Sequence, residues 1–153
     1  MHEEMIYNPV RGKRPQPKES ETAKNYTNTL IKESMNNCDF CGDNYKTNTA
    51  FDTFGRLETK YSYTAANTFK YDKWHSLINS RNHDPLNLNE IETIDMFNLA
   101  LKWFDKVNLI DKNAKYPELL WDAMPKSGAS QIHTHLQVCK SKEYIPFFSI
   151  SNY

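Results

Sequence analysis

Apolar and polar residues alternate over several short stretches of the chain, and this alternation predicts strands. Residues 57–69, LETKYSYTAANTF, are rich in Thr, Tyr and Phe and alternate in part, so they predict one or two strands. Residues 73–80, KWHSLINS, alternate more regularly and predict a short strand with a mixed outer face. Two later segments, PELLWDAM at 117–124 and SQIHTHLQVCK at 130–140, are also predicted to be strands.

Between residues 86 and 110 the apolar period changes to that of a helix. Asn87 and Glu90 have the spacing of a capping box at the start of this segment. Its apolar stripe is made of Ile94, Phe97, Leu101 and Phe104. Two strands, a long helix and two further strands predict an α+β fold in which the helix packs on one face of a sheet.

The ends of this pattern are polar or irregular. Residues 16–37 contain only three sizeable aliphatic side chains, so we expect a surface loop or a weakly held segment there. Residues 141–153 form an aromatic-rich tail, which we expect to pack against the sheet rather than on a partner. A length of 153 residues fits a single domain, or one half of a larger one.

Composition narrows the class of protein. The 19 basic and 19 acidic residues cancel, so nothing predicts a surface field for nucleic acid or membranes. No apolar run approaches the roughly 18 residues of a membrane span, and the first residues lack the apolar core of a signal peptide. The three cysteines, two of them in the motif CDFC, fit a reducing compartment. We therefore expect a cytoplasmic protein.

Candidate chemistry is concentrated in SGASQIHTHLQV, residues 127–138. On a strand, His133, His135 and Gln137 share one face, and the apolar residues between them contribute to the other. Imidazole can bind a metal, move a proton or attack phosphorus. The alternative is a pair of surface histidines on an edge strand.

The residues before the histidines are small. Gly128, Ala129 and Ser130 would let a ligand approach the backbone closely, and the Ser130 hydroxyl and the amides could bind phosphate oxygens. The small turn, together with a glutamine in phase with the histidines, favours a ligand site over the edge-strand alternative.

The segment GASQIHTHLQ resembles the His-x-His-x-Gln signature of the galactose-1-phosphate uridylyltransferase branch of the histidine-triad superfamily. The resemblance implies a histidine-triad-like antiparallel sheet with one long helix on a face. It also implies that His135 is the nucleophile that carries a nucleotidyl group as a phosphoramidate, with Gln137 and Ser130 as phosphate ligands. The same segment is similar to the diadenosine tetraphosphate phosphorylases, which pass an adenylyl group to phosphate.

CDFC supplies Cys38 and Cys41 at the spacing of half a tetrahedral zinc site. The uridylyltransferase pattern completes such a site with a histidine just before the long helix and the first histidine of the signature. Here these are His83 and His133, so the resemblance implies a Cys2His2 site that binds Zn2+. A redox pair is the alternative, and it would require a strand before the motif and a helix after it.

Four further features agree with the resemblance or depart from it. VRGKRP places Arg11 and Arg14 in the Arg-x-x-Arg-Pro that implies a diphosphate clamp, although a solvated basic turn is the alternative. AANTF places Asn67 where the resemblance implies a contact to the nucleoside, and turn chemistry is the alternative. His75 either faces the site or is an ordinary strand histidine. Asp122 departs from the pattern, because the family often has an asparagine there near the nucleotide phosphates, and a carboxylate would repel them.

The resemblance covers about residues 7–140, the amino-terminal half of a typical family member, and the second half of the family fold is absent. A fragment, a truncated product, or a single module that dimerises to build its site would each explain this. The resemblance implies a hexose-1-phosphate uridylyltransferase-like enzyme of galactose metabolism, with nucleotide-sugar and sugar-phosphate substrates. The alternatives are adenylyl transfer and a non-catalytic module that binds zinc and nucleotide.

Overall fold

Four antiparallel strands form one sheet in the computed structural model, which describes residues 20–125 and 128–143. The strands are β1 (Ser62–Ala66), β2 (Trp74–Ser80), β3 (Tyr116–Leu120) and β4 (His135–Ser141). Their order in the sheet is β1-β2-β4-β3, with each pair antiparallel. The predicted α+β fold is confirmed. The strand predicted over 130–140 begins only at His135, so His133 precedes it. Because β4 is an inner strand, His135 does not lie on a sheet edge, as the alternative interpretation required.

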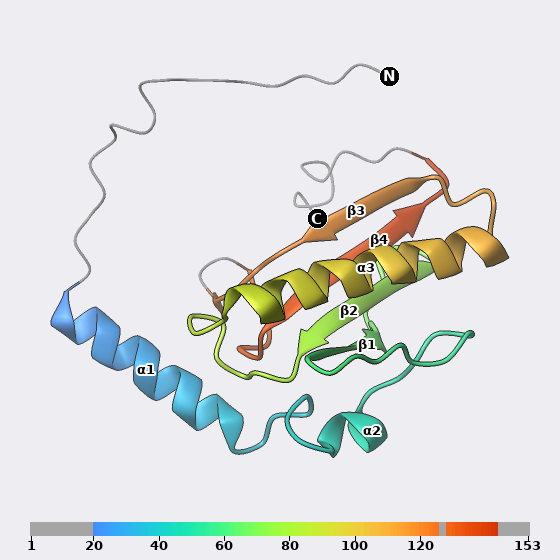
Figure 1. Ribbon diagram of the computed structural model, residues 1–153. Coiled ribbons are helices and arrows are strands. Elements are labelled where there is room, and N and C mark those ends of the chain that lie inside the picture. Colours follow the sequence, from blue (N-terminus) through green and yellow to red (C-terminus); the bar gives the residue numbers. More distant parts are fainter. Residues whose placement is uncertain (1–19, 126–127, 144–153) are drawn as a thin grey trace, which may run out of the picture.

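The long helix α3 (Glu90–Ile110) covers one face of this sheet (Figure 1). Its buried side meets apolar side chains from β2 and β4, and the main core consists of Trp74, Ile78, Met96, Leu99, Ala100, Trp103, Val107, Ala114, Leu136 and Val138. The buried carboxylate of Asp52 accepts hydrogen bonds within this apolar layer. The indole N–H of Trp103 donates to Asp52 Oδ2 (2.7 Å), and the Ser76 hydroxyl donates to the same oxygen (2.6 Å).

The predicted start of this helix was wrong by two residues. The N-cap is Asn89, whose side chain accepts from the backbone N–H of Glu92, while the Glu92 side chain accepts from the backbone N–H of Asn89. The sequence contains two overlapping Asn-x-x-Glu pairs, and either satisfies the spacing of a capping box. Asn87 instead closes a turn onto Asp84.

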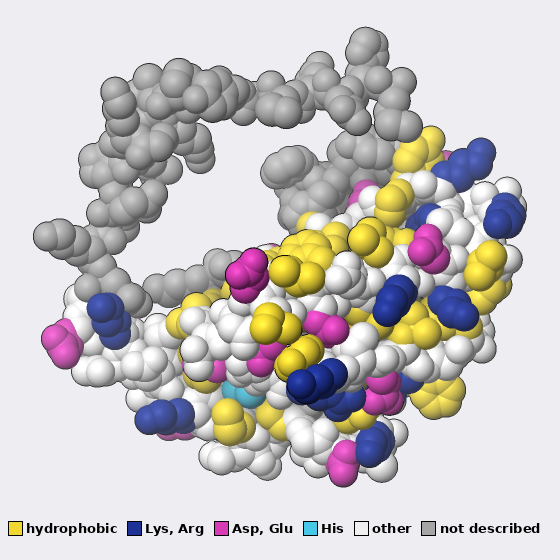
Figure 2. Space-filling view, viewed as in Figure 1, with side chains coloured by type: hydrophobic (Ala, Val, Ile, Leu, Met, Phe, Trp, Pro, Cys, Tyr) yellow, Lys and Arg dark blue, Asp and Glu magenta, His cyan; other side chains and the backbone are white. Residues whose placement is uncertain are grey.

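The predicted apolar stripe of α3 was also wrong. Ile94, Phe97 and Leu101 are 51%, 40% and 61% exposed, and only Phe104 packs in part against the core. Hydrophobic side chains accordingly appear on the outer surface over α3 in Figure 2. The helix is apolar on two neighbouring faces, and the sheet takes the face that carries Trp103.

Most of segment 16–37, predicted to be a loop, is the helix α1 (Glu21–Met35); residues 16–19 lie outside the described residues. Ser20 caps it by accepting from the backbone N–H of Ala23 (3.2 Å), and no Gly or Pro interrupts it. Its only buried residue is Ile31. The apolar signal was weak because α1 has little contact with the core.

The short helix α2 (Asn44–Asn48) lies beside β1 (Figure 1), and the ring of its Tyr45 stacks on that of Tyr63. Four buried residues, Cys38, Phe40, Tyr45 and Tyr63, form a second apolar cluster there. Of the tail at 141–153, Ser141 ends β4 and residues 144–153 lie outside the described part. Within the described residues, no helix has the length and apolar character needed to cross a membrane.

Candidate functional site

The four residues predicted as metal ligands lie together, with one donor atom of each within 4.8 Å of the others. Cys38 Sγ and Cys41 Sγ are 3.4 Å and 3.6 Å from His133 Nδ1, and Cys41 Sγ is 3.2 Å from His83 Nδ1. A tetrahedral zinc ion with bonds of about 2.0–2.3 Å places its ligand atoms about 3.3–3.8 Å apart. The donor atoms therefore already have nearly the spacing that such an ion requires, and the cluster could hold a metal ion.

Backbone carbonyls fix the tautomers of both histidines in this cluster. His83 Nε2 lies 3.2 Å from the Ile31 carbonyl oxygen, and His133 Nε2 lies 2.7 Å from that of Ser80. A carbonyl only accepts, so each Nε2 carries the hydrogen and each Nδ1 carries a lone pair. These two Nδ1 atoms are 3.2 Å apart. Two lone pairs at this distance repel each other unless a positive charge lies between them.

A proton is a poor candidate for that charge. Burial lowers the pKa of His133 to about 4, so the ring resists protonation near neutral pH. Burial, together with the neighbouring Cys38, raises the pKa of Cys41 to about 12 in the absence of a cation. A bound divalent metal reverses that preference by stabilising the thiolate. The set of two sulfurs and two imidazole nitrogens thus fits zinc.

Cys38 and Cys41 lie between α1 and α2, so a helix rather than a strand precedes them. This is not the strand–motif–helix context that the redox alternative requires.

His135 stands beside this cluster at the start of β4. Its side chain is 6% exposed, and Nδ1–H donates to the His133 carbonyl oxygen (2.7 Å). Nε2 is therefore the nitrogen with the free lone pair. Burial lowers the pKa of His135, which keeps the ring neutral and nucleophilic near pH 7. The ring of Phe40 lies 5.5 Å from that of His133 and 6.3 Å from that of His135, so both histidines are on one side of the sheet.

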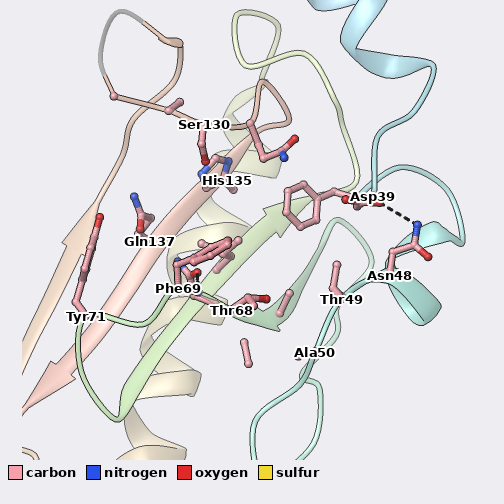
Figure 3. A pocket seen from close by; sticks show the side chains of 18 residues that line it. Asp39, Asn48, Thr49, Ala50, Thr68, Phe69, Tyr71, Ser130, His135 and Gln137 are labelled. Carbon is pink, nitrogen blue, oxygen red and sulfur yellow. Dashed lines mark hydrogen bonds between the residues drawn. The ribbon is translucent and has the colours of Figure 1, made fainter.

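His135 faces a pocket of about 470 Å³, shown in Figure 3. Gln137, Ser130 and Asn67 line the same pocket, so four of the residues predicted for substrate binding or catalysis meet there. Gly128 has φ +102°, a left-handed conformation that suits glycine and shapes the turn before Ser130. Aromatic and small side chains complete the wall, among them Phe40, Ala50, Ala65, Ala66, Phe69 and Tyr71. About half of the lining residues are polar, among them Asp39, Asn48, Thr49, Thr68 and Gln131, so the pocket offers hydrogen-bonding groups as well as apolar contacts.

His75 controls the orientation of the Gln137 amide. The backbone N–H of Tyr71 donates to His75 Nδ1 (3.1 Å), so the neutral ring carries its hydrogen on Nε2. This Nε2 lies 3.0 Å from Gln137 Oε1, which accepts from it. The glutamine amide NH2 is thereby turned away from His75 and reaches Asp122 Oδ2 at 3.5 Å. His75 itself is fully buried and does not line the pocket, so it is a hydrogen-bonded strand histidine that contacts the pocket residues Gln137 and Asn67.

Two other predicted residues, Asn67 and Asp122, lie at or near the pocket but make contacts other than those predicted. Asn67 Oδ1 accepts from the backbone N–H of Phe69 (2.8 Å), which is turn chemistry, although the residue also lines the pocket. Asp122 lies beside Gln137 and so close to the predicted phosphate ligands. Arg11 and Arg14 lie outside the described residues.

Sequence reasoning did not identify Phe40 or Ala65 as pocket residues. Phe40 lies between the two cysteines of CDFC, so its position next to the metal ligands was the available signal. Ala65 gave no signal, because a small residue on a strand has many roles.

No family model matches the sequence, and no curated protein is similar to it. Solved structures do resemble it. A HIT family protein from Bacillus anthracis has a TM-score of 0.60 at 17% identity, with 75% of this chain and 86% of that chain covered. A HIT family hydrolase from Clostridium thermocellum has a TM-score of 0.58 at 19% identity, with 72% and 96% covered. NitFhit from C. elegans has a TM-score of 0.51 at 20% identity, with 54% of this chain but only 20% of that chain covered.

These likenesses establish the fold. The chain has the α+β architecture of HIT-family structures, a four-stranded antiparallel sheet with a long helix packed on it.

Proposed function

We propose that this chain transfers a nucleotidyl group by way of a covalent intermediate on His135. The favoured reaction is that of a hexose-1-phosphate uridylyltransferase, with a nucleotide sugar as donor and a sugar phosphate as acceptor. The observation that carries the proposal is the state of His135: the ring is buried, Nδ1–H is engaged by the His133 carbonyl, and Nε2 has a free lone pair at a pocket.

The first half-reaction begins with the lone pair of His135 Nε2, which attacks the α-phosphorus of the donor. The P–O bond to the β-phosphate breaks, and its electron pair leaves with the sugar phosphate. Positive charge develops on the imidazole as the N–P bond forms, and the His133 carbonyl stabilises this charge through Nδ1–H. In the second half-reaction a phosphate oxygen of the acceptor attacks phosphorus, and the N–P electrons return to the ring.

Three neutral groups assist this transfer. The Gln137 NH2, whose direction is set by the bond from His75 to Gln137 Oε1, donates to the non-bridging phosphate oxygens. The Ser130 hydroxyl lines the same wall and provides a second donor. Asn67 binds the nucleoside end. Arg11 and Arg14 remain the diphosphate ligands that the sequence resemblance implies.

The Cys2His2 cluster would hold Zn2+ in a structural role. The bound ion would supply positive charge that keeps both thiols deprotonated and ties together loops from distant parts of the chain. The chain's own residues then carry the consequence. When His133 is fixed in the cluster, its carbonyl is held 2.7 Å from His135 Nδ1 and sets the orientation of the nucleophile.

Asp122 supports a second candidate, a module that binds zinc and nucleotide without catalysis. Its carboxylate lies 3.5 Å from the Gln137 amide, where it would compete with phosphate for the same donor and repel it. A diadenosine tetraphosphate phosphorylase-like adenylyl transfer uses the same nucleophile and differs in the base.

The test is covalent labelling of the purified chain with UDP-glucose that carries a labelled α-phosphorus. We expect a label that is stable in alkali, released by acid, and absent from the His135→Ala variant. The matched control His2→Ala removes a histidine distant in sequence from the signature and should label normally. Nucleotide binding without any label would support the non-catalytic module. Labelling by ATP or diadenosine tetraphosphate, but not by UDP-glucose, would assign adenylyl transfer.

A further inference from the structure

The helix α1 is attached to the rest of the protein mainly through its last turns. Figure 1 shows α1 extending away from the sheet, with its carboxyl end leading into the loop that carries Cys38 and Cys41. Ile31 is its only buried residue, and Tyr26 in its middle is 65% exposed. A helix of 15 residues is only marginally stable by itself, so its contacts near Ile31 decide whether it forms.

Those contacts end on a metal ligand. His83 Nε2–H points at two groups of α1, the carbonyl oxygen of Ile31 (3.2 Å) and the Ser34 hydroxyl (3.0 Å). The Ser34 hydroxyl donates to the same carbonyl (2.8 Å), so its oxygen keeps a lone pair for the histidine. The opposite nitrogen of the ring, Nδ1, is the one that faces Cys41 and His133. One imidazole therefore connects the helix to the metal cluster.

Each side of this ring strengthens the other. A cation at Nδ1 withdraws charge from the imidazole and makes Nε2–H a stronger donor to the helix. The carboxyl-terminal end of a helix carries partial negative charge, which favours a ring made more positive by a metal. Outer partners of metal-bound histidines hold the ring in its binding orientation and raise metal affinity.

We infer that metal binding and the docking of α1 stabilise each other through His83, with Ser34 as a positioning residue for this ligand. The inference rests on the proposed metal site but not on catalysis. Because coupling between two equilibria is reciprocal, a change that weakens the helix contact lowers metal affinity, and removal of metal loosens the helix by the same factor.

The first test compares two hydroxyl deletions in the full-length chain by zinc competition with a chelator. Ser34→Ala removes the side-chain contact of α1 to His83 and leaves only the one to the Ile31 carbonyl. Thr29→Ala is the matched control, because its hydroxyl also bonds a carbonyl within α1, that of Asn25 (2.9 Å), but is exposed and touches no ligand. We expect Ser34→Ala to lower zinc affinity about tenfold, the lower end of the effect of such outer partners, and Thr29→Ala to change it less than about twofold.

The second test is hydrogen exchange of the wild-type chain with and without zinc. We expect removal of zinc to raise exchange in the last two turns of α1 by at least about tenfold, with protection in the middle of α3 retained. The inference would be overturned if Ser34→Ala and Thr29→Ala bound zinc with equal affinity, or if hydrogen exchange in α1 were the same with and without zinc. Neither result would contradict the metal site itself. If α3 loses protection as well, the affinity comparison decides. Failure of the wild-type chain to bind zinc would overturn the metal site itself.

Discussion

The two faces of the sheet are held together in different ways. On one face, α3 packs apolar side chains such as Trp103 and Val107 against β2 and β4, and stability comes from burial. On the other face, loops from distant segments meet around two cysteines and two histidines whose lone pairs point at a common centre. We expect the first face to fold without a ligand, whereas the proposed cation would stabilise the arrangement of the second. The proposed function lies on this second face, which carries the candidate metal cluster and the pocket.

The largest effect on stability is expected on the helix face. Trp103→Ala empties a fully buried site and leaves Asp52 without its indole donor, so it should cost about 3–5 kcal/mol of unfolding free energy. Denaturant titration measures this value, and the metal content of the protein that remains folded should not change. Trp103→Phe is the control, because it keeps an aromatic ring and should cost less. A loss below about 1 kcal/mol for Trp103→Ala would show that this face does not carry the stability.

On the other face, the largest expected effect is loss of metal. Cys38→Ser removes one of four ligands, so metal per chain should fall from one to less than about a tenth after dialysis. Elemental analysis measures the content. Cys139→Ser is the matched control, since Cys139 is also a buried free thiol but lies outside the cluster. If both variants keep their zinc, the cluster is not the metal site.

A smaller effect is expected from the carboxylate beside Gln137. Asp122→Asn removes a negative charge near the predicted phosphate position, which at an effective dielectric constant near 20 is worth about 1–2 kcal/mol. The rate of His135 labelling should therefore rise about five- to thirtyfold, most strongly at low ionic strength. Asp105→Asn makes the same charge change on exposed α3 and should leave the rate unaltered. Slower labelling by Asp122→Asn would mean that the carboxylate assists the reaction.

The smallest effect is expected on the exposed side of α3. Leu101 is 61% exposed, so Leu101→Ser should change the unfolding free energy of the chain by less than about 0.5 kcal/mol. The same denaturant titration used for Trp103→Ala detects the difference. A loss above about 1 kcal/mol would mean that this side of the helix is covered in solution.

The sheet and the long helix were predictable because alternation and helical period are local properties of the sequence. The sequence did not predict which face of α3 is buried, because the exposed residues Ile94 and Leu101 are as apolar as the buried residues of the helix. Helix α1 was missed for the opposite reason. Only Ile31 is buried, so the apolar pattern that marks a packed helix is absent, and Ser20 as N-cap was the one local signal.

The parts of the candidate site that lie in short motifs were predictable from the order of those motifs. The contacts that depend on how two strands are aligned with each other were not predictable. Cys38 and His133 are 95 positions apart, and only the resemblance to a known pattern placed them together. The bond between His75 and Gln137 depends on the alignment of β2 with β4, which pairs Leu77 with Gln137 and puts His75 one step along on the same face. Alternation within one strand cannot give this alignment.

The central claim is that His135 Nε2 forms a bond to phosphorus, and mapping the modified residue tests it most directly. The chain is incubated with UDP-glucose, quenched in alkali and digested, and the peptides are sequenced by mass spectrometry. The account predicts one uridylyl group on His135, with His75 and His133 unmodified. A phosphoramidate on His133 or His75, or a fully unmodified chain that still binds the nucleotide, would contradict it.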